Sequence, residues 1–300
     1  MTVVGLSVPQ IGAHVTADVV EGFVRRAEEL GYGSLWVQER LLRPLHPRSK
    51  YAGVSDEIPA DYACALGPTE LLAAVAAWTS TVRLGTSVLV AGYHRPVELA
   101  KRLATIDVLS GGRLTVGLGI GWSAEEHEVC EVDPSTRGAR CDDFIPALLA
   151  CWGPDPVQHT GPFFTIPEAQ IGPKPVQDPR PPLIFGMPSR PGLRRTARWA
   201  DGWNPAGGRL DTILETKARL DAARPDGAAQ LTVHRRLFLQ PPVPTLRPRT
   251  VEAMAEEVAA SSRAGVDEVI VELSLWEELR SGDDWLAAPD RLLPVLEAAG

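Results

Sequence analysis

Three polar side chains are placed where they could carry acid–base or ionic chemistry. Glu39 and Arg40 directly follow the apolar segment 33–38, and His94 follows the apolar segment 82–90. Histidine titrates near neutral pH and can therefore donate or accept a proton, but a histidine at this position can equally cap the helix after it. Glu39 and Arg40 can contact a substrate or form structural ion pairs. For His94, and for Glu39 and Arg40, both alternatives stay open. All three residues are candidates for catalytic roles.

Two glycine-containing stretches are candidates for holding an anionic ligand. In "GLGIGWSAEE" (117–126) and "FGMPSR" (185–190), an apolar segment ends in glycine and a helix start follows. Glycine permits close backbone approach, and the free amides of a helix N-terminus attract anions. The alternative is a glycine-rich strand end packed against its neighbours. The candidate ligand-binding residues in these stretches are Gly119, Gly121, Trp122, Gly186, Met187 and Ser189.

The helix predicted after Trp122 has a cap signal but no metal-binding pattern. Ser123 and Glu126 have the spacing of a capping box. Residues 125–128 read Glu-Glu-His-Glu, but these adjacent positions lack a second histidine at i, i+4 spacing, so no metal site is expected. The cysteines show no CxxC spacing, which favours reduced thiols in a cytoplasmic protein. They are Cys64, Cys130, Cys141 and Cys151.

The elements that position these residues alternate between short apolar segments and amphipathic stretches. Eight strand–helix units in one chain predict a parallel sheet closed into a (β/α)8 TIM-type barrel, of class α/β. Strands are expected at about 3–9, 33–38, 82–89, 113–119, 182–187, 202–204, 231–239 and 267–272. The alternative, an open doubly wound sheet, normally carries GxGxxG after its first strand, and "GLSVPQIG" does not. In a barrel, function resides in the loops after the strands.

Composition and charge narrow the class of protein further. The 300 residues are 44% hydrophobic with a formal net charge of −8, which argues against general affinity for nucleic acid. No apolar run approaches the ~18 residues of a membrane span, and no signal sequence begins the chain. We expect a cytoplasmic protein with one domain over 1–300 and a proline-rich insertion at about 153–182, after the fourth strand–helix unit. Its partner is a small-molecule substrate, and a homodimer is an open alternative to a monomer.

Four long stretches resemble the bacterial luciferase-like superfamily, especially its branch dependent on coenzyme F420. They are "LGYGSLWVQER", "VRLGTSVLVAGYHRPVELAKRLATIDVLSGGRLTVGLGIGW", "GPKPVQDPRPPLIFG" and "RRTARWADGWNP". The resemblance implies an oxidoreductase that transfers hydride between coenzyme F420 and an organic substrate. Two alternatives are a monooxygenase that uses reduced FMN and a flavin-binding protein without turnover.

The resemblance also implies roles for particular residues. A non-proline cis peptide, here Ser87–Val88, would form a bulge behind the central ring of the cofactor. The loop Gly119–Trp122 would lie along the cofactor, and the loop Gly186–Ser189 would offer amides to its phosphate. The segment 153–182 would match the family's variable insertion over the pocket, which helps to set substrate choice.

The sequence departs from the family pattern at two places. Many similar proteins have a histidine after the acidic residue, where this chain has Arg40. An arginine stays protonated and is no general base, so Arg40 would instead hold an anionic substrate or stabilise negative charge on the ring. "FGMPS" (185–189) replaces the more usual glycine-glycine-serine pattern at the phosphate loop.

Overall fold

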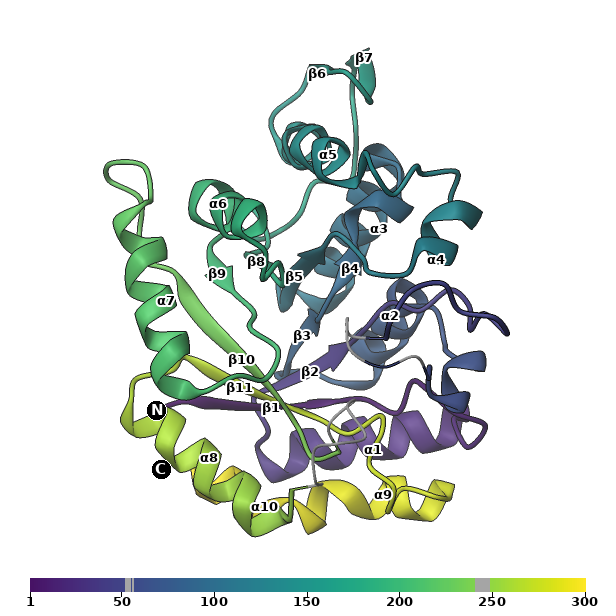
Figure 1. Cartoon of the computed structure of the whole chain (residues 1–300), viewed down its shortest axis with the longest axis vertical. Helices are drawn as coiled ribbons and strands as arrows, with labels where there is room; N and C mark the ends of the chain where they lie inside the picture. Colours follow the sequence, from purple (N-terminus) through teal and green to yellow (C-terminus); the bar gives the residue numbers. More distant parts are fainter. Residues whose placement is uncertain (52–54, 56, 241–248) are drawn as a thin grey trace.

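Parallel strands close into the predicted barrel (Figure 1). The computed structural model describes residues 1–51, 55, 57–240 and 249–300. In chain order the barrel strands are β1 (Val3–Ser7), β2 (Ser34–Val37), β3 (Arg83–Thr86), β4 (Leu89–Val90), β5 (Leu114–Gly119), β8 (Leu183–Phe185), β9 (Gly202–Trp203), β10 (Thr232–Phe238) and β11 (Glu268–Glu272). β4 continues the position of β3, and pairing of β3 with β5 and of β1 with β11 closes the barrel.

Helices surround the barrel and connect successive strands (Figure 1). The main ones are α1 (Ala17–Leu30), α2 (Pro68–Trp78), α3 (Pro96–Ser110), α4 (Ala124–Val129), α5 (Arg137–Trp152), α6 (Arg190–Trp199), α7 (Leu210–Ala222), α8 (Val251–Arg263), α9 (Gly282–Arg291) and α10 (Leu293–Glu297). Two helix ends follow from local sequence. Gly31 ends α1 in the left-handed conformation with φ 92°, and Pro68 opens α2.

The interior of the barrel combines an indole with a buried carboxylate and imidazole. The Trp36 ring packs with Ile184 and Ile270, and a Cβ on Gly85 would lie 2.3 Å from that ring, so only glycine leaves room for it. Trp36 Nε1 donates to Glu268 at 2.8 Å, and the other Glu268 oxygen lies 2.7 Å from His234 Nδ1. These partners allow a fully buried carboxylate inside the barrel.

The main hydrophobic core lies between the sheet and the helices. Phe23 of α1, Leu72 of α2, Leu103 of α3 and Phe144 of α5 are buried in one cluster with the outward-facing side chains of the strands. This burial places the carboxyl ends of all the barrel strands at one end of the molecule. The loops that leave those strands are therefore brought together, as the site requires.

The proline-rich segment forms a small hairpin that the sequence did not predict. β6 (Val157–Thr160) and β7 (Thr165–Ala169) pair antiparallel and extend outward from α5 (Figure 1). Asp143 of α5 holds the hairpin, because its carboxylate accepts the amides of Phe163 and Phe164 and lies 2.8 Å from His159 Nε2. No residue of 153–182 lines either of the two clefts described below. That this segment covers the pocket stays a prediction.

Two further features are the length of the helices and the state of the cysteines. Within the described ranges, no helix is long and apolar enough to cross a membrane. All four cysteines are free thiols, of which Cys141 and Cys151 are buried.

Candidate functional site

The bond between β3 and β4 has the geometry expected from the family resemblance. The Ser87–Val88 peptide is cis, which confirms the prediction. The Val88 side chain projects between two of the predicted glycines. A Cβ on Gly119 would lie 2.7 Å from Val88 Cγ2, and one on Gly186 would lie 3.0 Å from Val88 Cγ1. Both glycines therefore make room for one valine that lines a cleft.

A cleft of ≈ 320 Å³ opens beside Val88, at the carboxyl ends of β8, β9 and β10. Helices α6 and α7 both begin at this cleft. The N-cap residue of α7 forms no side-chain cap, but the Thr212 amide in the first turn donates to Asp211 Oδ1 at 2.6 Å, so only the amides before Thr212 are offered to a ligand. The lining includes four predicted residues, Ser87, Val88, Gly186 and Met187. It also includes Pro188, Leu193, Trp203, Asn204, Pro205, Ala206, Gly207, Gly208, Arg209, Thr212, Ile213, Thr216 and Arg236.

Arg236 brings a positive charge into this cleft, and the sequence reasoning missed it. Its guanidinium donates to the Ser87 carbonyl and to the Glu272 carboxylate, and to Gln38 Oε1 at 3.1 Å. Its Nε has no hydrogen-bond partner among the described residues. The available signal was an arginine in the middle of an otherwise buried strand, since a charge there is rare unless it has a partner or a function.

Glu272 is the buried counter-charge of Arg236. Burial raises the pKa of a carboxyl group, but here the charge of Arg236 and hydrogen bonds from Ser274 outweigh it and lower the Glu272 pKa below its ordinary value. Asn204, which also lines the smaller cleft, joins Ser87 to the backbone of β10. Its Oδ1 accepts from Ser87 Oγ at 2.7 Å and its Nδ2 donates to the His234 carbonyl at 2.6 Å. The wall of the cleft is thus held by paired groups.

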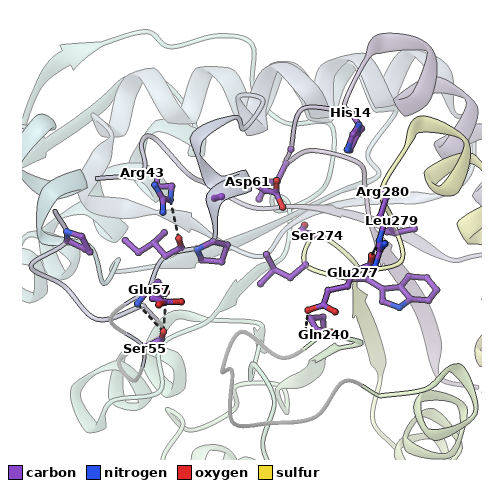
Figure 2. Close-up of a pocket in the computed structure, with 18 of the residues that line it drawn as sticks. His14, Arg43, Ser55, Glu57, Asp61, Gln240, Ser274, Glu277, Leu279 and Arg280 are labelled. Atoms are coloured by element: carbon purple, nitrogen blue, oxygen red, sulfur yellow. Dashed lines mark hydrogen bonds between the residues drawn. The ribbon is translucent and has the colours of Figure 1, made fainter. Parts of the chain in front are cut away.

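A second and larger cleft, of ≈ 870 Å³, lies over the carboxyl ends of β1, β2 and β11. Figure 2 shows Arg43 and Glu57 on one side, Glu277 and Arg280 on the other, and Ser274 between them. Each of these two sides of the cleft thus carries one acidic and one basic side chain. Apolar groups make up much of the rest of the lining, including Ile11, Leu45, Ile58, Leu275, Trp276 and Trp285. The cleft therefore suits an organic molecule of moderate size.

Polar side chains connect the two clefts. Gln38 Nε2 donates to Ser274 Oγ at 3.2 Å, and Ser274 lines the larger cleft. Gln38 Oε1 accepts from Arg236, which lines the smaller cleft. The two clefts are thus neighbours at the mouth of the barrel, with Gln38 bonded to a lining residue of each.

Two of the three catalytic candidates come together. His94 Nε2 lies 2.9 Å from Glu39 Oε1, and the other Glu39 oxygen accepts the Val90 amide at 2.7 Å. Glu39 is almost fully buried, whereas the His94 side chain keeps 17% of its exposure. The 2.9 Å contact lacks hydrogen-bond geometry, since His94 Nε2 has no hydrogen-bond partner among the described residues, and neither residue lines either cleft. Their catalytic roles stay a prediction.

Arg40 lies elsewhere. It was expected to point into the open cavity, but it lines neither cleft. Its guanidinium lies 3.3 Å from the buried Glu126 and above the rings of Trp122 and Tyr62. Contact of Arg40 with a ligand therefore stays a prediction. It does not form an exposed surface pair either, because 10% of it is accessible.

The remaining predicted ligand residues have structural contacts in this chain. Gly121, with φ 73°, is packed so closely that a Cβ would lie 2.7 Å from His127. Trp122 packs on Tyr51 with ring centroids 5.4 Å apart, and the Ser189 hydroxyl caps α6 by accepting the Gly192 amide. None of these three lines the smaller cleft, so their contact with a ligand stays a prediction.

The predicted capping box of α4 is half correct. Ser123 accepts the Glu126 amide at 3.2 Å, as expected. The Glu126 side chain, however, turns to Arg40 and the Leu41 amide instead of returning to the cap residue. Among the residues that the structure describes, no group of histidine, cysteine, aspartate and glutamate side chains could hold a metal ion.

Comparison with known proteins places the chain in a family. The model of the family described as luciferase-like monooxygenase matches residues 2–274. The chain belongs to the luciferase-like monooxygenase family. The barrel, the bond at Ser87–Val88 and the loops after the strands described above are thus those of a luciferase-like protein.

Relatives of this luciferase-like chain include proteins with different cofactors. An uncharacterized protein of Mycobacterium tuberculosis is 30% identical over 91% of this chain and 92% of its own length. The oxygenase component of a flavin-dependent trigonelline monooxygenase from Acinetobacter baylyi is 35% identical over 41% of this chain and 34% of its own. An F420-dependent secondary alcohol dehydrogenase has the same fold, with a TM-score of 0.74 over 100% of this chain and 99% of its own at 15% identity.

Proposed function

We propose that this luciferase-like protein is an oxidoreductase that transfers hydride between coenzyme F420 and an organic substrate. The observation that carries the proposal is the smaller cleft, where Val88 projects between Gly119 and Gly186 and Arg236 supplies a buried cation. A planar ring needs a firm backing of this kind, and β-branched valine has a stiff side chain.

The residues present fit such a cofactor. The unpartnered Nε of Arg236 is a buried donor, and a buried donor needs an acceptor. The uncapped start of α7 and the loop Gly186–Ser189 supply amides for a phosphate. When bound, the cofactor supplies a two-electron hydride donor or acceptor. Val88 would support the ring, and Arg236 would stabilise negative charge at its edge.

In this proposal the larger cleft holds the body of the organic substrate, between apolar walls with charged groups around them. Hydride transfer needs the reacting atoms about 3–3.5 Å apart, so the reacting end of the substrate would extend past Gln38 to the ring. His94, whose Nε2 lies 2.9 Å from Glu39 Oε1, is the titratable group proposed to exchange a proton with the substrate. Neither residue lines a cleft, so this role requires the substrate to reach beyond the larger cleft. Arg40 is not proposed for the role, because an arginine stays protonated.

A second candidate is a monooxygenase that uses reduced FMN. It is favoured by the local similarity to the trigonelline monooxygenase, which is flavin-dependent. The two candidates differ in the oxidant, since the monooxygenase consumes oxygen and the F420 enzyme does not.

Titration of the purified protein with coenzyme F420, FMN and riboflavin, read by fluorescence quenching, tests the proposal. We expect F420 to bind, and its violet absorbance to change under anaerobic conditions when a suitable organic substrate is added. Riboflavin, which lacks the phosphate, is the control for the phosphate site. Binding of FMN with oxygen consumption would support the second candidate. Failure of both cofactors to bind would contradict the proposal, whereas binding without turnover on a broad substrate panel would indicate a flavin-binding protein.

A further inference from the structure

The guanidinium of Arg40 contacts two aromatic rings and a carboxylate. The Cζ atom lies 4.7 Å from the centroid of the Trp122 ring and 5.4 Å from that of the Tyr62 ring. A guanidinium nitrogen lies 3.3 Å from Glu126 Oε2. An arginine held in this way, with 10% of its side chain exposed, has little surface left for a substrate.

Glu126 joins the segment after β2 to helix α4. Its side chain is fully buried. One oxygen accepts the Leu41 amide at 2.8 Å, and the other accepts the Tyr93 hydroxyl at 3.0 Å and faces Arg40. A buried carboxylate keeps its charge only with such partners, and Arg40 is the cation among them. Removal of Arg40 would leave Glu126 short of a counter-charge.

The neighbouring carboxylate holds the same segment. Glu125 accepts the Arg48 amide, and the Ser49 hydroxyl accepts the amide of Ala124 at 2.8 Å. Partial burial raises the pKa of Glu125, but hydrogen bonds from the Arg48 amide, its own amide and Ser123 outweigh this effect and lower the pKa to about 2. The acidic start of α4 is therefore occupied by the backbone of the segment after β2.

Beneath this segment lies a small hydrophobic cluster, separate from the main core. It consists of Ile11, Tyr51, Ile58 and Tyr62, with Ala65, Trp122 and Leu275 packed against it. The hydroxyls of Tyr51 and Tyr62 are 2.6 Å apart. This hydrogen bond joins residues 41–51 to residues 57–66. Arg40 contacts this cluster through Tyr62 and Trp122, while Ile11, Ile58 and Leu275 line the larger cleft.

We propose that Arg40 is a positioning residue that fastens residues 41–51 and 57–66 to α4 and thereby sets the shape of the larger cleft. It acts through Trp122, Tyr62 and Glu126, not by contact with the reacting atoms. The proposal rests on the proposed function only in assigning the organic substrate to the larger cleft.

Hydrogen exchange measured by mass spectrometry on the protein without cofactor tests the fastening. The variants are Arg40→Met and Arg40→Lys, with Arg25→Met as control, because Arg25 pairs with Glu21 on the exposed face of α1. We expect faster exchange in the peptides that cover 41–51 and 57–66 in Arg40→Met. The barrel strands should exchange as in the parent protein. Arg40→Lys should rescue only in part, since lysine restores the charge but lacks the planar group that stacks on aromatic rings.

Steady-state kinetics supplies the second readout. Misplacement of a cleft wall should raise KM for the organic substrate about ten-fold or more, while kcat and the affinity for the cofactor stay unchanged. Unchanged exchange in both peptides would overturn the proposal, as would a lower kcat at unchanged KM. Hydrogen exchange is measured without cofactor or substrate. It therefore tests the role of Arg40 in fastening the segment even if the proposed function is wrong. If Arg40→Met does not fold, Arg40→Lys and Glu126→Gln provide the same comparison, because the glutamine keeps the acceptor for Leu41 but removes the charge.

Discussion

At the scale of single residues, the arrangement around Val88 depends on two positions without side chains. Gly119→Ala would place a Cβ 2.7 Å from Val88 Cγ2, so the valine or the loop must move. Overpacking of this kind costs about 1–3 kcal/mol, and we expect the affinity for the cofactor to fall about five-fold or more. Titration by fluorescence quenching measures the change.

A matched control is Gly172→Ala, where an added Cβ would meet nothing within 4 Å. That variant should bind the cofactor like the parent protein. Equal affinity of the Gly119 and Gly172 variants would show that Val88 and its surroundings do not contact the cofactor.

Arg236 and Glu272 allow a sharper test, because each is the buried partner of the other. Arg236→Met leaves a buried carboxylate without its cation and should lower the free energy of unfolding by about 3–5 kcal/mol. The double variant with Glu272→Gln removes the unpaired charge and should lose less than Arg236→Met alone. Urea unfolding of the single and double variants measures this difference. A double variant less stable than Arg236→Met alone would contradict the assignment of a charge pair.

Sequence reasoning at this scale found single residues but not their partners. Glu39 and His94 were both candidates, yet nothing in the sequence indicated that they lie side by side in the fold. They are 55 positions apart in the chain. Arg40 was placed in the cavity because the family resemblance puts a functional side chain there. Its actual environment is formed by Tyr62, Trp122 and Glu126, and only the folded chain brings these residues together.

At the scale of elements, the barrel strands were predicted and the hairpin was not. Most barrel strands are short runs rich in apolar residues, which is a strong local signal. The hairpin β6–β7 has exposed, polar positions among prolines, and its stability depends on Asp143 of α5. A contact of that kind has no signature in the local sequence.

Asp143 therefore provides the test of the hairpin. Asp143→Ala removes the acceptor of the Phe163 and Phe164 amides, and we expect faster hydrogen exchange over 157–169. Cofactor affinity should not change, because the hairpin lines neither cleft. A loss of cofactor affinity in this variant would place the hairpin at the site after all.

At the scale of the whole molecule, buried carboxylates make stability depend on pH. Burial raises the pKa of Glu268 and Glu272, but the contacts with His234 and Arg236, respectively, outweigh it and lower both below the ordinary value of 4.5. Hydrogen bonds to three successive amides do the same for Glu28. A carboxylate with a lowered folded-state pKa stabilises the fold above its unfolded-state pKa. That contribution is lost as the pH falls further and the group is protonated.

We therefore expect the urea midpoint to be steady near neutral pH and to decrease as the pH falls below about 4.5. The Glu272→Gln variant lacks this carboxylate, so its urea midpoint should decrease less as the pH falls. A midpoint that stays constant down to pH 3 would contradict this account of the buried charges.

The separation of the two clefts has a consequence for the order of binding. Their linings share no residue, and Gln38 bridges them through Ser274 and Arg236. Neither ligand needs to depart before the other arrives, so both reactants are present together in a ternary complex. Initial rates at several fixed concentrations of the second reactant should then give intersecting double-reciprocal lines. Parallel lines would mean that the reactants occupy one shared space in turn.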